Sequence, residues 1–193
     1  MKKLSGGVII LIVLAIIVMW GIGKYNGMVK ESQKVEKAWG DVEAQYQRRA
    51  DLIPNLVETV KGYASHENQT LQDVVNARAK ATSITVDIND EASLKKFQDA
   101  QGELSQALGR LIAVSESYPD LKANQNFLEL QSQLEGTENR ITTARNAFNE
   151  AARSYNTGIM TFPSNIIANM FGFKSKAYFA SKEGADVAPE VKF

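Results

Sequence analysis

The sequence contains no cysteine and only one histidine, His66. Without cysteine the chain can form no disulfide framework, no thiol nucleophile and no thiolate metal site. A single histidine also excludes zinc sites that are built from several histidines. Glycine-rich phosphate loops and paired metal-binding carboxylates do not occur in the sequence either. We therefore expect no metal, no cofactor and no chemistry that depends on a thiol.

An excess of basic charge is also missing. The chain has 22 Lys and Arg residues against 22 Asp and Glu residues, so its formal net charge is zero. Nucleic-acid-binding domains need a basic surface to neutralise phosphates. We expect no nucleic acid among the partners.

Charge is absent altogether from one long apolar stretch, residues 4–23. About 20 helical residues that rise about 1.5 Å each cover the hydrocarbon core of a bilayer, which is about 30 Å thick. The stretch predicts a single transmembrane helix, preceded by a short flank at residues 1–3. A cleaved secretory signal is the alternative, because Lys2 and Lys3 precede the apolar run, but small residues spaced for cleavage do not come after it.

Two patterns bear on which side of the membrane the rest of the chain occupies. Lys24, Lys30, Lys34 and Lys37 come after the stretch, and a count of basic residues alone favours a cytoplasmic domain. A short basic region that leads directly into an apolar run is instead typical of a signal anchor that exports the domain behind it. We predict a single-pass protein of the bacterial inner (cytoplasmic) membrane, with its C-terminal domain on the periplasmic or extracellular side.

Residues 24–160 carry apolar side chains at alternating spacings of three and four, which predicts amphipathic helices. We expect a first long helix from near Tyr25 to near Ala64, continuous with the membrane span. Pro54 removes the backbone bond to the carbonyl of Ala50, so a bend is expected there. Asn68 is the expected cap of a second helix.

The second half of this region gives the clearest pattern. Residues 82–90 alternate like a strand, but a lone strand has no partner, so we interpret them as an ordered linker. Two antiparallel helices should come next, the first ended by Pro119 and the second starting near Phe127. The predicted fold class is all-α: a transmembrane helix that runs into an elongated antiparallel bundle of about four helices, with a short C-terminal helix and a loose tail.

The densest group of polar residues lies in the first helix, and most of its members look structural. Arg49 falls on the same apolar stripe as Trp39, so it needs an acidic or carbonyl partner when buried. A structural ion pair that braces a bent helix is the favoured interpretation. The candidate structural or interaction residues of this helix are Trp39, Arg48, Arg49, Asp51, Pro54 and Asn55.

Catalysis has one weak candidate, His66 beside Glu67, as an acid and base pair of a hydrolase. Adjacent residues on a helix point to different faces, and no third group stands at a spacing that would orient them. We favour a loop or capping role for His66 and predict that the protein is not an enzyme.

Residues 161–182 form a predicted apolar docking segment, and residues 183–193 a flexible tail. Proline near the start of the segment and the apolar cluster behind it indicate a short helix. That helix is expected to dock on the bundle, on a neighbouring subunit or on the membrane surface. Its candidate interaction residues are Phe162, Ile166, Ile167, Met170, Phe171 and Phe173.

Motifs along nearly the whole chain resemble those of the LemA family. They occur in order and without a departure from the family pattern. They are Tyr25-Asn26, Ala38-Trp39, Arg48-Arg49 with Asp51 to Val57, Val60 to Tyr63, His66-Glu67, Ala77-Arg78, Tyr118-Pro119 with Leu121 to Asn124, Leu134 to Ile141, Ala144-Arg145, Tyr155-Asn156 and Phe162 to Ser164. The resemblance implies a bacterial single-pass membrane protein with a helical bundle and no defined enzyme activity, linked to envelope organisation and to the surroundings of membrane proteases.

We predict a non-enzymatic helical scaffold that self-associates at the bacterial envelope and organises membrane or partner proteins. Apolar stripes wider than one bundle seam, such as Leu52 beside Ile53, leave surface for a second subunit. The expected partners are the membrane, further copies of the chain and an envelope protein. The alternative is an adaptor that presents clients to a membrane protease or another envelope machine.

Overall fold

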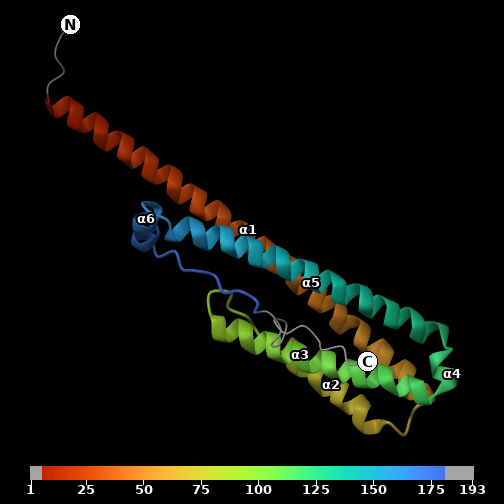
Figure 1. Ribbon diagram of the computed structural model, residues 1–193. Helices are drawn as coiled ribbons and strands as arrows, with labels where there is room; N and C mark the ends of the chain where they lie inside the picture. Colours follow the sequence, from red (N-terminus) through yellow and green to blue (C-terminus); the bar gives the residue numbers. More distant parts are fainter. Residues whose placement is uncertain (1–5, 181–193) are drawn as a thin grey trace, which may run out of the picture.

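The computed structural model describes residues 6–180, and these are helical apart from short connections and the extended residues 173–180 (Figure 1). No strand occurs between residues 6 and 180. The elements, in chain order, are α1 (Gly6–Tyr63), α2 (Asn68–Thr82), α3 (Glu91–Val114), the short 3-10 helix η1 (Ser115–Ser117), α4 (Pro119–Lys122), α5 (Gln125–Met160) and α6 (Ser164–Phe171). The expected flank at residues 1–3, the first two residues of the expected span and the tail at 183–193 lie outside the described residues.

Helix α1 joins the apolar stretch to the bundle without a break. Its 58 residues correspond to a rod of about 87 Å. The first buried residue of α1 is Met28, so the apolar start of the helix projects beyond the rest of the molecule (Figure 1). Pro54 lies inside α1 and does not end it.

The bundle consists of two antiparallel pairs. Helix α5 runs back along α1, while α2 and α3 pack against each other below them (Figure 1). The direction of the chain reverses from each of these four helices to the next, which gives the predicted elongated antiparallel bundle. Helix α6 then contacts both α5 and α1 close to the place where α1 leaves the bundle.

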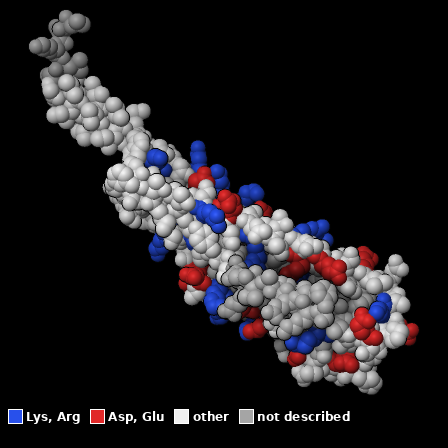
Figure 2. Space-filling view, viewed as in Figure 1, with Lys and Arg blue, Asp and Glu red and all other residues white. Residues whose placement is uncertain are grey.

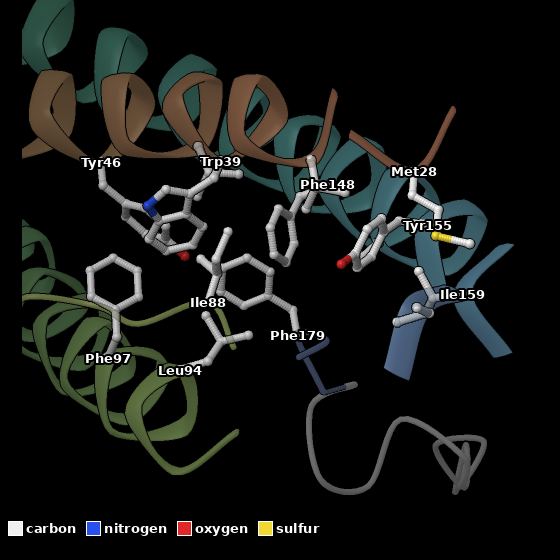
Figure 3. Packing of buried hydrophobic residues seen from close by; sticks show 14 of the residues in the cluster. Met28, Trp39, Tyr46, Ile88, Leu94, Phe97, Phe148, Tyr155, Ile159 and Phe179 are labelled. Carbon is white, nitrogen blue, oxygen red and sulfur yellow. The ribbon is translucent and has the colours of Figure 1, made fainter. Parts of the chain in front are cut away.

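Two apolar clusters fill the bundle, one near the projecting end of α1 and one at the far end. The near cluster is rich in aromatic residues, with Trp39 in contact with both Phe97 and Phe148 (Figure 3). The far cluster is mainly aliphatic and includes Ile53 and Leu104. The apolar face of α1 reaches both clusters, because its buried residues recur at helical spacing from Met28 to Val60.

The helix ends differ in detail from the sequence prediction. Asn68 is the first residue of α2 rather than its cap, and the preceding Glu67 makes no capping bond. Asp90 does cap α3, because its carboxylate accepts from the backbone N–H groups of Ala92 and Ser93. Residues 83–90 form the expected ordered linker, and its Ile88 is buried in the near cluster.

Candidate functional site

The projecting end of α1 and helix α6 together form an apolar surface at one end of the molecule. Helix α6 reaches α1 because Ile167 is buried against it, and a Cβ placed on Gly21 would lie 3.9 Å from Ile167 Cδ1. The ring of Tyr25 contacts those of Phe171 and Phe173, with centroids 4.9 Å and 5.5 Å apart. The docking of α6 is therefore fixed within one protomer.

One face of this end remains uncovered. Met160, Phe162, Ile166, Met170 and Phe171 are all exposed, and we call these five residues the collar. Phe162 and Met170 are 76% and 71% exposed, values that are unusual for such large apolar side chains in a soluble protein. Helix α6, which carries Ile166, Met170 and Phe171, lies next to the base of the projecting part of α1 (Figure 1).

The apolar part of α1 is equally uncovered. By its length and composition α1 can cross a membrane, and its most apolar 18-residue stretch has no buried residue. Figure 2 shows that the free end of α1 displays no charged side chain, and that Lys, Arg, Asp and Glu begin where α1 meets α5 and α6. The collar thus stands at the boundary between the uncharged and the charged parts of the molecule.

A shallow cavity of about 620 Å³ lies at the same boundary, between α1 and the junction of α5 with α6. Trp20, Lys24 and Met28 of α1 face Tyr155 and Phe162 across it. The Lys24 ammonium lies 5.9 Å from the Trp20 ring, which places an aromatic ring and a cation together as at the interface of a membrane.

A polar layer built around Arg49 separates the two apolar clusters. Arg49 is 3% exposed, and its guanidinium donates to Ser105 Oγ at 3.0 Å and to Glu138 Oε2 at 2.9 Å. It also donates to the side chain of Gln101, which is itself buried. Arg49 therefore links α1 to α3 and α5 at once, and the predicted structural ion pair has Glu138 as its acid.

Tyr46 lies one helical turn before Arg49 and stacks its ring against the same guanidinium, 5.1 Å from the ring centroid. Burial raises the pKa of the Tyr46 hydroxyl, while the nearby charges of Arg145 and Arg49 act to lower it. A cleft of about 510 Å³ opens beside these residues between α3 and α5. The terminal nitrogens of Arg49 in this cleft are hydrogen-bonded within the bundle, although its buried Nε is not, and we interpret the cleft as part of the structural core.

The remaining polar candidates of α1 do not gather around Arg49. Arg48, Asp51, Pro54 and Asn55 are exposed, and the Asp51 carboxylate accepts a bond of 2.7 Å from Gln47. Pro54 leaves the carbonyl of Ala50 without its helical donor. Arg49 does not bond to this carbonyl; Arg78 of α2 does, with Nε donating to Ala50 O at 2.7 Å.

The pair His66 and Glu67 lies in the turn between α1 and α2. His66 is exposed, whereas the half-buried Glu67 accepts a bond of 3.1 Å from the hydroxyl of Tyr118. This hydrogen bond raises the pKa of Tyr118. Glu67 is thus bonded to a residue of the α3–α4 connection, which is a structural role.

Three residues matter here to which the sequence analysis gave no role: Phe179, Asn149 and Asn156. Phe179 is buried in the near cluster, and the two asparagines of α5 bond to the backbone of the chain beyond α6. Asn149 and Asn156 stand seven residues apart, which puts them on one face of α5. That spacing was the available signal, but a pair of amides has no distinctive pattern until the segment it binds is known.

Comparison with known proteins gives a family match and several relatives. The model of the family described as "LemA family" matches residues 38–193. Protein LemA of Metamycoplasma hominis is 26% identical over 162 residues, which cover 84% of this chain and 71% of the relative. Magnetosome protein MamQ 2 of Paramagnetospirillum magneticum is 29% identical over 182 residues, covering 84% and 67%. Magnetosome protein MamQ of Magnetospirillum gryphiswaldense is 26% identical over 190 residues, covering 87% and 70%. Neither the family description nor these names states an enzymatic activity.

Proposed function

Because the chain belongs to the LemA family, we propose that it is a membrane-anchored helical scaffold that self-associates and organises proteins at the bacterial envelope. The observation that carries this proposal is the collar, an apolar surface left open beside a helix that can cross a membrane. An open surface of this kind has to be covered by lipid, by a second protein or by both.

The bilayer covers the first part of this surface. Apolar residues of α1 from Val8 to Met19 are exposed along the whole projecting segment, and in water this exposure would be strongly unfavourable. A bilayer around this segment brings α6 to the level of the lipid headgroups, where helices with one apolar face lie flat. Collar side chains then enter the membrane edge, each contributing about 1.5 to 3 kcal/mol when fully buried.

Anchoring also aligns neighbouring copies. Every copy enters the membrane with the same end, so the bundles stand side by side as parallel rods. From Met28 to Tyr63, α1 extends for about 36 residues, or about 54 Å, beyond the membrane edge. Such rods present long flanks to one another and to other envelope proteins. This geometry supports a scaffold, and the relatives named as magnetosome proteins are likewise named for a cellular structure and not for a reaction.

The proposal is tested by the size of the full chain extracted in a mild detergent. We expect a discrete assembly of several copies at about micromolar protein concentration. A double variant of the collar, Phe162→Ser with Met170→Ser, should lower the assembly state or weaken membrane attachment while circular dichroism stays unchanged, since both side chains are exposed. The matched control is Leu128→Ser, which removes an exposed apolar residue far from the collar.

Two results would contradict the scaffold. A monodisperse monomer of the unmodified chain would show that the chain does not self-associate. The second result comes from crosslinking in intact cells. A scaffold gives mainly adducts between copies of the chain. Mainly one foreign adduct would instead indicate an adaptor for a membrane protease or another envelope machine.

A further inference from the structure

The segment after α6 is an extended strap, residues 173–180, that lies along the bundle (Figure 1). It begins after Gly172, whose φ of +73° turns the chain out of α6. Phe173 N still donates to Ala168 O of α6, at 3.0 Å. Beyond it the strap belongs to no helix or sheet, so its N–H and C=O groups have to bond elsewhere. Their partners include side chains of α5 and α3 and the linker before α3.

Asn149 and Asn156 each make two bonds to the backbone of the strap. The side chain of Asn156 donates to Lys176 O and accepts from Lys176 N, both at 2.8 Å. Asn149 makes the same two bonds with Phe179, at 3.1 Å and 2.9 Å. Each amide therefore pairs with one strap residue as a neighbouring β-strand would.

The spacing of the two asparagines matches the spacing of an extended peptide. Seven residues of α5 advance by about 10.5 Å, and the three steps from Lys176 to Phe179 advance by about 10 Å when extended. The opposite wall adds Ile88, whose carbonyl accepts from Ala177 N at 2.8 Å. We call the set Ile88, Gln98, Arg145, Asn149 and Asn156 the strap site.

These bonds hold the backbone of the strap, and several of its side chains are contacted as well. The Tyr178 hydroxyl accepts a bond of 2.8 Å from Asn156, and the Phe173 ring contacts that of Tyr25. Phe179 is 5% exposed and contacts the rings of Trp39 and Phe148 (Figure 3). The Arg145 guanidinium lies 4.5 Å from the Phe179 ring, and the Lys176 ammonium 5.7 Å from the Tyr155 ring. The chemistry selects an extended basic peptide with an aromatic anchor three residues after a lysine.

The strap site also complements the charge of the strap. Two bonds from Asn89 hold the pKa of the Asp87 carboxyl below its usual range, and the charges of Lys174 and Lys176 lower it further. The Asp87 carboxylate thus accompanies the end of the strap that carries the lysines.

We propose that the strap site is a peptide-binding site whose ligand, besides the strap of its own chain, is the strap of a second copy. The inference rests on the proposed function, because it names the contact through which anchored copies associate. A strap from a neighbour makes the same bonds as the strap in place, so exchange costs little binding energy. Parallel anchoring holds each strap at the height of the neighbouring strap site and raises its effective concentration there.

The test uses the full chain, whose lack of cysteine makes introduced thiols unique. Gln98 Nε2 donates to Ala180 O at 3.1 Å, so Gln98→Cys and Ala180→Cys bring two thiols within reach of a short bis-maleimide. The two variants carry different tags and are produced together in one membrane. An adduct between the tags then reports a strap bound across copies. The chain that carries both substitutions shows whether the reagent reaches within one copy.

The matched control replaces Gln98→Cys by Lys96→Cys. Lys96 is exposed and stands two residues from Gln98, at nearly the same height but on the other side of α3. We expect several-fold more mixed adduct with Gln98→Cys than with Lys96→Cys. Adding Asn149→Asp and Asn156→Asp to the Gln98→Cys chain should remove this excess, because a carboxylate cannot donate to the strap carbonyls.

The outcomes separate the exchange from the scaffold. An excess that depends on the asparagines supports exchange between copies. Complete crosslinking within one chain, without mixed adduct, in a protein that still assembles overturns the exchange and leaves the scaffold standing on another surface. A protein that neither assembles nor gives mixed adduct overturns both.

Discussion

At the scale of single residues, Arg49 shows how one charge is kept inside an apolar bundle. Its partners Ser105, Gln101 and Glu138 come from two other helices, so the side chain fixes the relative position of three helices. A buried arginine needs partners for its charge, and here the two terminal nitrogens of Arg49 are bonded while the buried Nε is not. The polar layer therefore favours one alignment of the helices over others that shift the apolar stripes.

Replacing Arg49 by alanine should lower the free energy of unfolding by about 1 to 3 kcal/mol, because the buried Gln101 loses its hydrogen bond and Glu138 loses its ion pair. The matched control is Arg48→Ala. Arg48 is exposed and adjacent, and a surface change of this kind costs less than about 0.5 kcal/mol. Urea unfolding followed by circular dichroism measures both values. Equal effects of the two substitutions would mean that the polar layer does not stabilise the bundle.

For single residues, the sequence predicted the burial of some side chains but not which distant residues they contact. The apolar stripe that Arg49 shares with Trp39 predicted burial and an acidic or carbonyl partner, because helical periodicity fixes the face of each residue. It did not identify Glu138, 89 residues away along the chain. Phe179 was missed as a core residue for the same reason. It lies in an extended segment without periodicity, and its burial depends on contacts with Trp39 and Phe148.

At the scale of elements, Pro54 accounts for a hydrogen bond between α1 and α2. Proline has no N–H, so the carbonyl of Ala50, four residues earlier, lacks its helical partner. Arg78 of α2 supplies the missing donor, with its Nε 2.7 Å from Ala50 O. A potential weak point of a long helix thus becomes a contact between two helices.

A double-mutant cycle tests this account. Arg78→Ala should cost about 1 to 2 kcal/mol in the unmodified chain, since the carbonyl of Ala50 then loses a charged donor. In a Pro54→Ala background the restored N–H can bond the same carbonyl, so Arg78→Ala should cost about 0.5 to 1 kcal/mol less. Strictly additive costs in thermal or urea unfolding would contradict a shared carbonyl.

The elements themselves were largely predictable, but their ends were less so. Periodicity gave the long first helix, the linker and the two later helices, because each buries one regular stripe. The cap of α2 was wrong, since Asn68 begins the helix. Capping depends on the backbone conformation of the preceding turn, which composition does not specify. The docking partner of α6 was left open, because its apolar face fits a bundle, a neighbour or a membrane equally well.

At the scale of the whole molecule, the direction of insertion decides where the bundle works. We predict that a reporter active only outside the cytoplasm, fused after Phe193, is active, because the short basic start of the chain favours export of the bundle. A reporter active only in the cytoplasm is the control at the same position. Activity of the second and silence of the first, in stably expressed fusions, would reverse the orientation.

The last prediction concerns the part of the chain after α5. Ile167 and Ala168 of α6 and Phe179 of the strap are buried in the near cluster, which also contains Trp39. Ending the chain after Thr161 removes all three, and loss of one buried phenylalanine alone costs about 3 to 5 kcal/mol. We therefore expect the chain that ends at Thr161 to unfold at a clearly lower urea concentration than one that ends at Ala180. Because Trp39 contacts Phe97 as well as Phe179, its fluorescence reports whether the near cluster survives.

Equal unfolding midpoints for the two chains would mean that the contacts of α1, α3 and α5 stabilise the bundle alone and that the strap is only bound to its surface. A lower midpoint for the shorter chain would make the strap a working part of the fold, and its exchange between copies would then couple the stability of each bundle to that of its neighbour.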